Sequence, residues 1–200
     1  MKILENYLFN IDGDEFLLRT ADYSNTKVKE NKYPLFQLDK IYIFDNGEDT
    51  KVLYNQLKKD IHYLILQIKL SNKKVFYVYP IDYKSPNQSM FWKFFYDEID
   101  RKNRVKVIPY IKNNTSIFMK NNKPVMIGKK INVEFNQFEK VLQINLVLNN
   151  NFLIRKILNY ILSKDKSVYV GLTIETYPED YYGEELLCIF GLNSLSTIRT

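Results

Sequence analysis

The stretch HYLILQIKLSNKKVFYVYPIDY, residues 62–83, carries the clearest structural signal in this 200-residue chain. Two runs rich in β-branched and aromatic residues, 62–70 and 74–83, have the composition of strands. The short polar segment 71–73 separates them, and this spacing is typical of a β-hairpin. We therefore predict two antiparallel strands here, with further elements on either side.

Apolar residues before and after this hairpin follow either the two-residue period of a strand or the spacing of a helix. Strands are predicted at 15–20, 26–33, 39–45, 104–111, 116–120, 130–136, 140–148, 167–176 and 185–192. Helices are predicted at 1–8, 50–61, 89–102 and 151–164. Because short polar turns join most of the strands, we expect an α+β fold with antiparallel sheets and the helices on one face.

A possible linker divides the chain near its middle. Residues 81–89, IDYKSPNQS, contain a proline, an asparagine and two serines. The parts on either side share an order of elements: helix, several strands, helix, then two strands. This pattern predicts two similar α+β domains, 1–84 and 85–200, although a chance match of pattern is also open.

The composition is that of a globular protein with a basic excess. Hydrophobic residues make up 46% and charged residues 26%, and the formal net charge is +6. Such an excess favours polyanionic partners, but lysines also keep proteins soluble, and an AT-rich genome would enrich them too. The charge alone leaves these explanations open.

Several kinds of site lack the residues they need. The single cysteine, Cys188, lies in an apolar run and is expected to be a buried, inert thiol. The single histidine, His62, is expected to be structural, and the six glycines form no phosphate-binding loop. We expect no enzymatic activity, no cofactor and no metal. Without a secretory segment or an apolar run long enough to cross a bilayer, we expect an intracellular protein without membrane contact.

One acidic segment allows two interpretations. Its carboxylates are Glu175, Glu179, Asp180, Glu184 and Glu185. Converging carboxylates bind Mg²⁺ in two-metal nucleases, so such a site is conceivable. Four of the five fall on a predicted hairpin loop, which favours a solvated acidic loop.

Basic residues lie opposite the apolar stripe on three of the predicted helices. They are Lys51, Lys58 and Lys59 on the second helix, Lys93 and Arg101 on the third, and Arg155 and Lys156 on the fourth. On the third helix, Asp97 and Asp100 dilute the charge. Helix faces of this kind suit sequence-independent contacts with phosphates, whereas the ordinary alternative is a solvated face.

The aromatic segment MFWKFFY, residues 90–96, also allows more than one interpretation. Its aromatic residues fit a single helical stripe, which favours a core face. A membrane-surface patch or a base-stacking patch is the less favoured alternative.

The pieces ILENYLFN, IDGDEFLLR, TADYSN and TKVKE, within residues 3–30, look like the first domain of ring-shaped DNA polymerase sliding clamps of the PCNA and tailed-phage type. The resemblance implies helices that line a ring and carry Lys51, Lys58, Lys59, Lys93, Arg101, Arg155 and Lys156 towards double-stranded DNA. It implies a partner pocket that includes Ala21, Val28, Ile81 and Tyr83. It also implies a homotrimer that acts with a DNA polymerase or other replication proteins.

The resulting expectation is a non-enzymatic, sequence-independent, DNA-binding processivity factor. The alternative is a viral structural, assembly or inhibitor protein that binds an acidic partner through basic helix faces. A metal nuclease that uses Glu175 and its neighbours is a third, weaker possibility.

Overall fold

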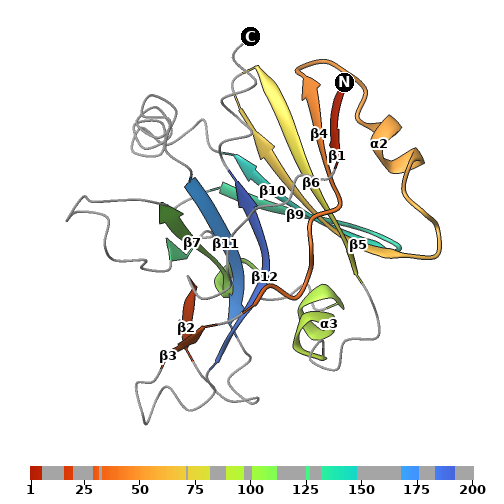
Figure 1. Ribbon diagram of the computed structural model, residues 1–200. Helices are drawn as coiled ribbons and strands as arrows, with labels where there is room; N and C mark the ends of the chain where they lie inside the picture. Colours follow the sequence, from red (N-terminus) through yellow and green to blue (C-terminus); the bar gives the residue numbers. More distant parts are fainter. Residues whose placement is uncertain are drawn as a thin grey trace.

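The hairpin predicted at residues 62–83 is present, and it lies in the middle of the larger sheet (Figure 1). Its strands are β5 (His62–Lys69) and β6 (Lys73–Ile81). They pair antiparallel, from His62 opposite Ile81 to Lys69 opposite Lys74. The computed structural model describes residues 1–5, 16–19, 29–31, 33–70, 72–81, 89–96, 101–111, 125–126, 132–147, 168–175 and 183–191.

Four strands extend this hairpin into a six-stranded sheet with the order β1-β4-β6-β5-β10-β9. The added strands are β1 (Lys2–Glu5), β4 (Lys40–Asp45), β9 (Asn132–Phe138) and β10 (Val141–Val147). Neighbouring strands are antiparallel except for β5 and β10, which run parallel with Tyr63 opposite Val141. The sheet is therefore mixed, and the expectation of purely antiparallel pairing fails at this one pair.

This sheet takes strands from both sides of the domain boundary expected at residue 84. β1, β4, β5 and β6 precede the boundary, whereas β9 and β10 follow it. Residues 2–5 also differ from the sequence-based expectation, because they form an edge strand instead of the start of a helix at 1–8. Pairing with β4 satisfies their backbone groups, and a helix of two turns is marginal in water.

A second sheet contains four strands in the order β12-β11-β7-β8. These strands are β7 (Val105–Ile111), β8 (Val125–Met126), β11 (Val168–Glu175) and β12 (Glu184–Gly191). A short ladder joins β2 (Leu17–Arg19) to β3 (Lys29–Asn31). Most of the predicted strands are thus confirmed with small changes of boundary, and the strand predicted at 116–120 lies outside the described residues.

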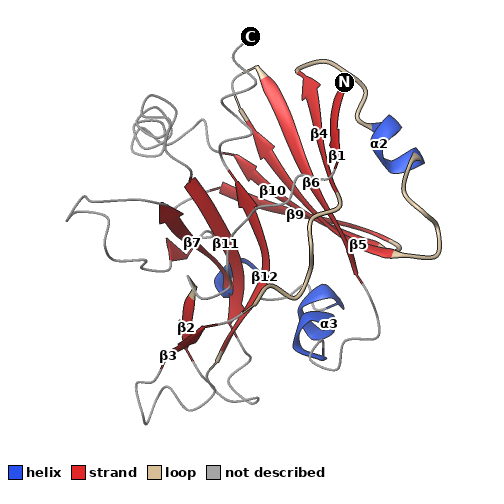
Figure 2. Cartoon of the chain, viewed as in Figure 1, coloured by secondary structure: helices blue, strands red, loops and turns tan. Residues whose placement is uncertain are grey.

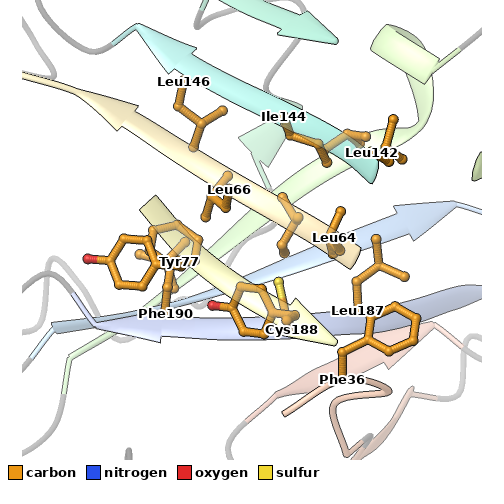
Figure 3. Packing of buried hydrophobic residues seen from close by; sticks show 14 of the residues in the cluster. Phe36, Leu64, Leu66, Tyr77, Leu142, Ile144, Leu146, Leu187, Cys188 and Phe190 are labelled. Carbon is orange, nitrogen blue, oxygen red and sulfur yellow. The ribbon is translucent and has the colours of Figure 1, made fainter. Parts of the chain in front are cut away.

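The main core lies between the two sheets (Figure 3). Its side chains include Leu64 and Leu66 of β5, Leu142, Ile144 and Leu146 of β10, and Leu187, Cys188 and Phe190 of β12. Two buried tyrosines of β6 reach across it, because Tyr77 Oη donates to the Gly191 carbonyl at 2.8 Å and Tyr79 Oη to the Ile189 carbonyl at 2.9 Å. These bonds satisfy hydroxyl groups that would otherwise destabilise an apolar interior.

A second, smaller cluster covers the outer face of the six-stranded sheet. Leu53 of α2 (Lys51–Asn55) packs there against side chains of β4, β5 and β6, among them Tyr42, Tyr63 and Phe76. Leu57 and Ile61 pack against the same cluster from the loop that follows α2. Because both faces of the central strands are covered, their sequences read as nearly continuous apolar runs.

Strands predominate over helices in the described chain, so the α+β class is sheet-dominant (Figure 2). The predicted helix 50–61 ends at Asn55, because Leu57 and Ile61 reach the sheet from a loop and need no helix to do so. The predicted helix 89–102 covers α3 (Ser89–Tyr96) and the first two residues of α4 (Arg101–Arg104), and residues 97–100 lie outside the described chain. The predicted helix 151–164 lies outside the described residues.

Candidate functional site

A pocket of about 860 Å³ lies beside α2 on the outer face of the six-stranded sheet. Four segments line it: α2, the loop at 56–61, the start of β5, and the hairpin that joins β9 to β10. The parallel pairing of β5 with β10 creates this arrangement, because it brings the start of both strands to one end of the sheet.

Apolar side chains form the floor of the pocket. This apolar floor consists of Tyr54, Leu57, Ile61, Tyr63, Phe138 and Val141. Strand alternation sends Tyr63 to the outer face and its neighbour Leu64 into the main core. The rings of Tyr54 and Phe138 meet edge to face with centroids 5.7 Å apart, and Phe138 is 50% exposed. The floor is therefore partly open to solvent.

Lysines surround this floor. The lysine rim consists of Lys51, Lys58, Lys59 and Lys140, of which the first three are exposed and Lys140 is half-buried. Glu139 is the one carboxylate among the residues that line the pocket, and Asp60 lies in the same loop as Lys58 and Lys59. The lining carries more positive than negative charge, so it favours an anion.

Backbone hydrogen bonds fix the positions of the loop and the hairpin. The Lys58 N–H donates to Tyr63 Oη at 3.2 Å, and the Tyr63 N–H donates to the Lys140 carbonyl at 2.8 Å. Glu139, at the tip of the hairpin, has a φ of 30°, which costs energy for a residue other than glycine. Lys58 and Lys140 of the lysine rim are thus bonded to Tyr63, the residue of β5 that belongs to the apolar floor.

A buried network of amide groups holds Tyr54 in the apolar floor. Tyr54 Oη donates to Gln143 Oε1, and Gln143 Nε2 donates to Gln67 Oε1 at 2.9 Å and to Asn145 Oδ1. Gln143 is 3% exposed. Burial raises the pKa of Tyr54, so its hydroxyl stays protonated and keeps donating.

His62 lies between two residues of the apolar floor in sequence, but its ring packs elsewhere. Its centroid is 5.2 Å from Trp92 and 5.7 Å from Phe95, and its Nε2 is 3.5 Å from Tyr96 Oη. Burial, and secondarily the charge of Lys140, lower the pKa of His62. This imidazole therefore lies close to both α3 and the lysine rim.

The structure brings together three of the residues expected to bind phosphates, Lys51, Lys58 and Lys59. Lys93 is exposed on α3, outside the pocket lining. Arg101 lies inside the molecule at 4% exposure, where it donates to the carbonyls of Phe94 and Phe95 and to Gln137 Oε1. It therefore caps the end of α3 instead of presenting its charge on a surface.

The remaining expected site residues divide into two groups. Ile81 is buried in the main core at 2% exposure. Ala21, Val28, Tyr83, Arg155 and Lys156 lie outside the described residues. Sequence reasoning missed Lys140, Tyr54 and Phe138, since only the pairing of β5 with β10 brings the hairpin to α2.

Two of the five clustered carboxylates form a buried ion triad with a lysine. Lys106 Nζ lies 3.0 Å from both Glu175 Oε1 and Glu184 Oε1, and Lys106 and Glu184 are buried. Glu175 and Glu184 face each other across β11 and β12, so they belong to strands and not to a loop. Within the described ranges, no three His, Cys, Asp or Glu residues are grouped as a metal site requires.

Two other observations bear on expectations from the sequence. Cys188 is buried, as predicted, and burial raises its pKa well above its usual value, so the thiol is unreactive. In the part of the chain that the structure describes, no helix has the length and apolar character needed to cross a bilayer.

Comparison with known proteins corrects the resemblance to sliding clamps. Residues 9–196 match the family described as Protein ENHANCED DISEASE RESISTANCE 2, C-terminal. No curated protein and no solved structure matches the chain. The sliding-clamp prediction is wrong, and the expectations of DNA replication, a homotrimeric ring and a viral origin fall with it. About thirty residues carried that resemblance, whereas the family match spans nearly the whole chain, which therefore belongs to the family of the C-terminal region of protein ENHANCED DISEASE RESISTANCE 2.

Proposed function

We propose that this protein is a non-enzymatic binding module whose ligand is an anionic amphiphile held in the pocket beside α2. The observation that carries the proposal is the combination of an apolar floor with a lysine rim in one pocket. The rim suits a phosphate or carboxylate group, and the floor suits the apolar body of the same molecule.

The size and lining of the pocket support a small molecule. Its volume of about 860 Å³ falls in the usual range for ligand pockets, about 300–1,000 Å³. Aromatic rings such as Tyr54 and Tyr63 give large contact areas with few rotatable bonds. Ligand pockets are typically apolar with a few charged groups that fix orientation, and this lining has that composition.

The charged groups of the lysine rim suit the binding of an anion better than they suit catalysis. Exposed lysine ammonium groups are hydrated point charges that bind anions without a fixed geometry. His62, which could transfer protons near neutral pH, packs against Trp92 and Phe95 and does not line the pocket. A binding role therefore fits the pocket better than acid–base catalysis.

Isothermal titration with monomeric dodecyl phosphate, below its micelle concentration, tests this function. We expect saturable binding that weakens as salt is added, because salt screens exposed charges. Dodecyl maltoside, which has the same chain without the charge, and inorganic phosphate, which has the charge without the chain, should both bind far more weakly.

The double variant Lys58→Glu/Lys59→Glu should lose about tenfold or more in affinity for dodecyl phosphate, which corresponds to about 1.4 kcal/mol. Its matched control is Lys2→Glu/Lys69→Glu, which makes the same change of net charge at two exposed lysines outside the pocket lining. Equal losses in both variants, or duplex DNA binding more tightly than dodecyl phosphate, would contradict the proposal.

A further inference from the structure

Helix α3 divides its aromatic residues between the core and the surface. Phe91, Phe94 and Phe95 are fully buried, in agreement with the favoured core interpretation of this segment. Tyr96 is 59% exposed, and its ring stacks on half-buried Trp92 with centroids 6.0 Å apart and planes 25° apart. Lys93 is exposed between them in sequence. We call Trp92, Lys93 and Tyr96 the α3 edge.

The α3 edge lies near the end of the sheet that bears the pocket. His62, at the start of β5, contacts both Trp92 and Tyr96. The next residue, Tyr63, belongs to the apolar floor, and its backbone is bonded to Lys140 of the lysine rim. Exposed Phe138, at the end of β9 and three residues before the start of β10, adds another aromatic ring to the apolar floor.

The residue types at this end of the molecule are those that suit a membrane interface. Trp and Tyr favour the headgroup region, where the ring is in a partly apolar layer and the polar atom stays in water. Lysines near the surface of a bilayer are attracted to anionic headgroups. Asp97, Glu98 and Asp100 follow Tyr96 in sequence, so the attraction is assigned mainly to the lysine rim and less to Lys93.

We propose that the protein docks on an anionic bilayer through the α3 edge and the tip of the β9–β10 hairpin, and that the pocket takes its ligand from that bilayer. The inference rests on the proposed function, since it names the source of the amphiphile. Charge complementarity selects this partner, because the pocket lining has four lysines and a single carboxylate. A bilayer supplies both the anionic surface and the apolar ligand, whereas an acidic protein segment supplies only the charge.

Docking of this kind needs no membrane-spanning helix. Lysines and a few aromatic rings hold a protein at the interface by surface attraction and shallow burial. The proposal departs from the sequence-based expectation of no membrane contact, and at residues 90–96 it adopts the membrane-surface alternative for Trp92, Lys93 and Tyr96 while Phe91, Phe94 and Phe95 belong to the core.

The chain contains a built-in probe of docking, because Trp92 is its one tryptophan. The experiment uses vesicles of phosphatidylcholine alone and vesicles of phosphatidylcholine with phosphatidylserine, and measures cosedimentation together with Trp92 emission. We expect binding to the anionic vesicles, a blue shift of the emission, and quenching by lipids with brominated acyl chains. Vesicles of phosphatidylcholine alone should give none of these changes.

The variant Lys93→Glu/Tyr96→Ser changes two exposed residues that do not line the pocket. It should lower affinity for anionic vesicles about tenfold and leave dodecyl phosphate binding unchanged. Its matched control is Lys69→Glu/Tyr33→Ser, which changes an exposed lysine and a tyrosine that is 69% exposed. The control should bind vesicles like the original protein, and melting curves of both variants establish that they fold.

The outcomes separate this inference from the proposed function. If dodecyl phosphate binds but anionic vesicles neither bind the protein nor shift Trp92 emission, docking is excluded while the pocket function stands. If dodecyl phosphate also fails to bind, the proposed function fails as well. If polyglutamate displaces the vesicles and bound Trp92 is not quenched by brominated chains, the surface fits an acidic protein partner and the bilayer is excluded.

Discussion

Two groups of lysines in this molecule show how burial decides what a charge does. Lys106 is buried and lies 3.0 Å from each of two carboxylates. Most of the lysine rim is exposed and surrounds an apolar floor. A charge removed from water must be paired to be tolerated, whereas an exposed one remains available to a ligand. Lys106 is therefore part of the fold, and the lysine rim is part of the proposed binding surface.

The largest effect is expected on stability, when the buried lysine of this comparison, Lys106, is replaced. Replacing Lys106 by methionine leaves Glu184 buried without its cation, which should cost about 3–5 kcal/mol of unfolding free energy. Urea denaturation measures this loss. The double variant Lys106→Met/Glu184→Gln removes the two buried charges and leaves only that of the partly exposed Glu175, so it should recover much of the loss. If replacing Lys106 costs no more stability than replacing an exposed lysine, burial does not distinguish Lys106 from the lysine rim.

A smaller effect is expected at the amide network beneath the pocket. Tyr54→Phe removes the hydroxyl that donates to Gln143, which leaves a buried acceptor unsatisfied and should cost about 1–3 kcal/mol. Thermal unfolding measures the change. Dodecyl phosphate should also bind more weakly, because the ring of Tyr54 is no longer fixed. Unchanged stability would mean that water reaches Gln143, contrary to its burial.

A substitution at the tip of the β9–β10 hairpin should stabilise the protein. Glu139→Gly relieves the positive φ and should stabilise the fold by about 0.5–1 kcal/mol. It also removes the carboxylate from the pocket lining, so the affinity for dodecyl phosphate should rise. Glu139→Gln removes the charge but keeps the backbone strain, and should therefore raise affinity without raising stability. If the glycine variant is less stable than the original, the strain at this residue is not real.

The smallest expected effect concerns His62, whose pKa lies below its ordinary value of 6.5. The folded protein then binds fewer protons than the unfolded chain, so this group's contribution to stability is complete above pH 6.5 and is lost as the pH falls below it. As the chain has a single histidine, its proton signal can be followed by NMR without assignment. The titration midpoint should rise in Lys140→Gln and when dodecyl phosphate binds. If neither Lys140→Gln nor dodecyl phosphate shifts the titration midpoint of His62, Lys140 is too far away to affect its pKa.

The sequence predicted most of the strands but not how they assemble. Composition within 62–70 and alternation within 140–148 identified β5 and β10 separately, because both are local properties of the sequence. Their parallel pairing is non-local: Gln67 and Gln143, which bond across it, are 76 positions apart. The division at residue 84 followed from local composition, which carries no information about such pairing.

The residues of the candidate site could be predicted only in part. Lys51, Lys58 and Lys59, expected on one helix face, do line one pocket, but Lys58 and Lys59 reach it from the loop after α2 and not from a helix. Phe138 lies in a predicted turn and Lys140 at the start of a predicted strand, where nothing local marks either residue. Arg101 was expected at the surface because of its charge. It is buried instead, since its guanidinium donates to carbonyl groups at the end of α3.

The parallel pairing of β5 with β10 has a consequence for the order in which the protein folds. The β5–β6 hairpin closes a loop of a few residues and can form within microseconds, whereas β10 must find β5 across a long stretch of chain. Until it does, one edge of β5 stays open and is exposed to pairing with other chains. Residues at the starts of both strands line the pocket, so the pocket is complete only when this slowest pairing of the larger sheet has formed. A ligand of the pocket would therefore bind only the fully folded protein.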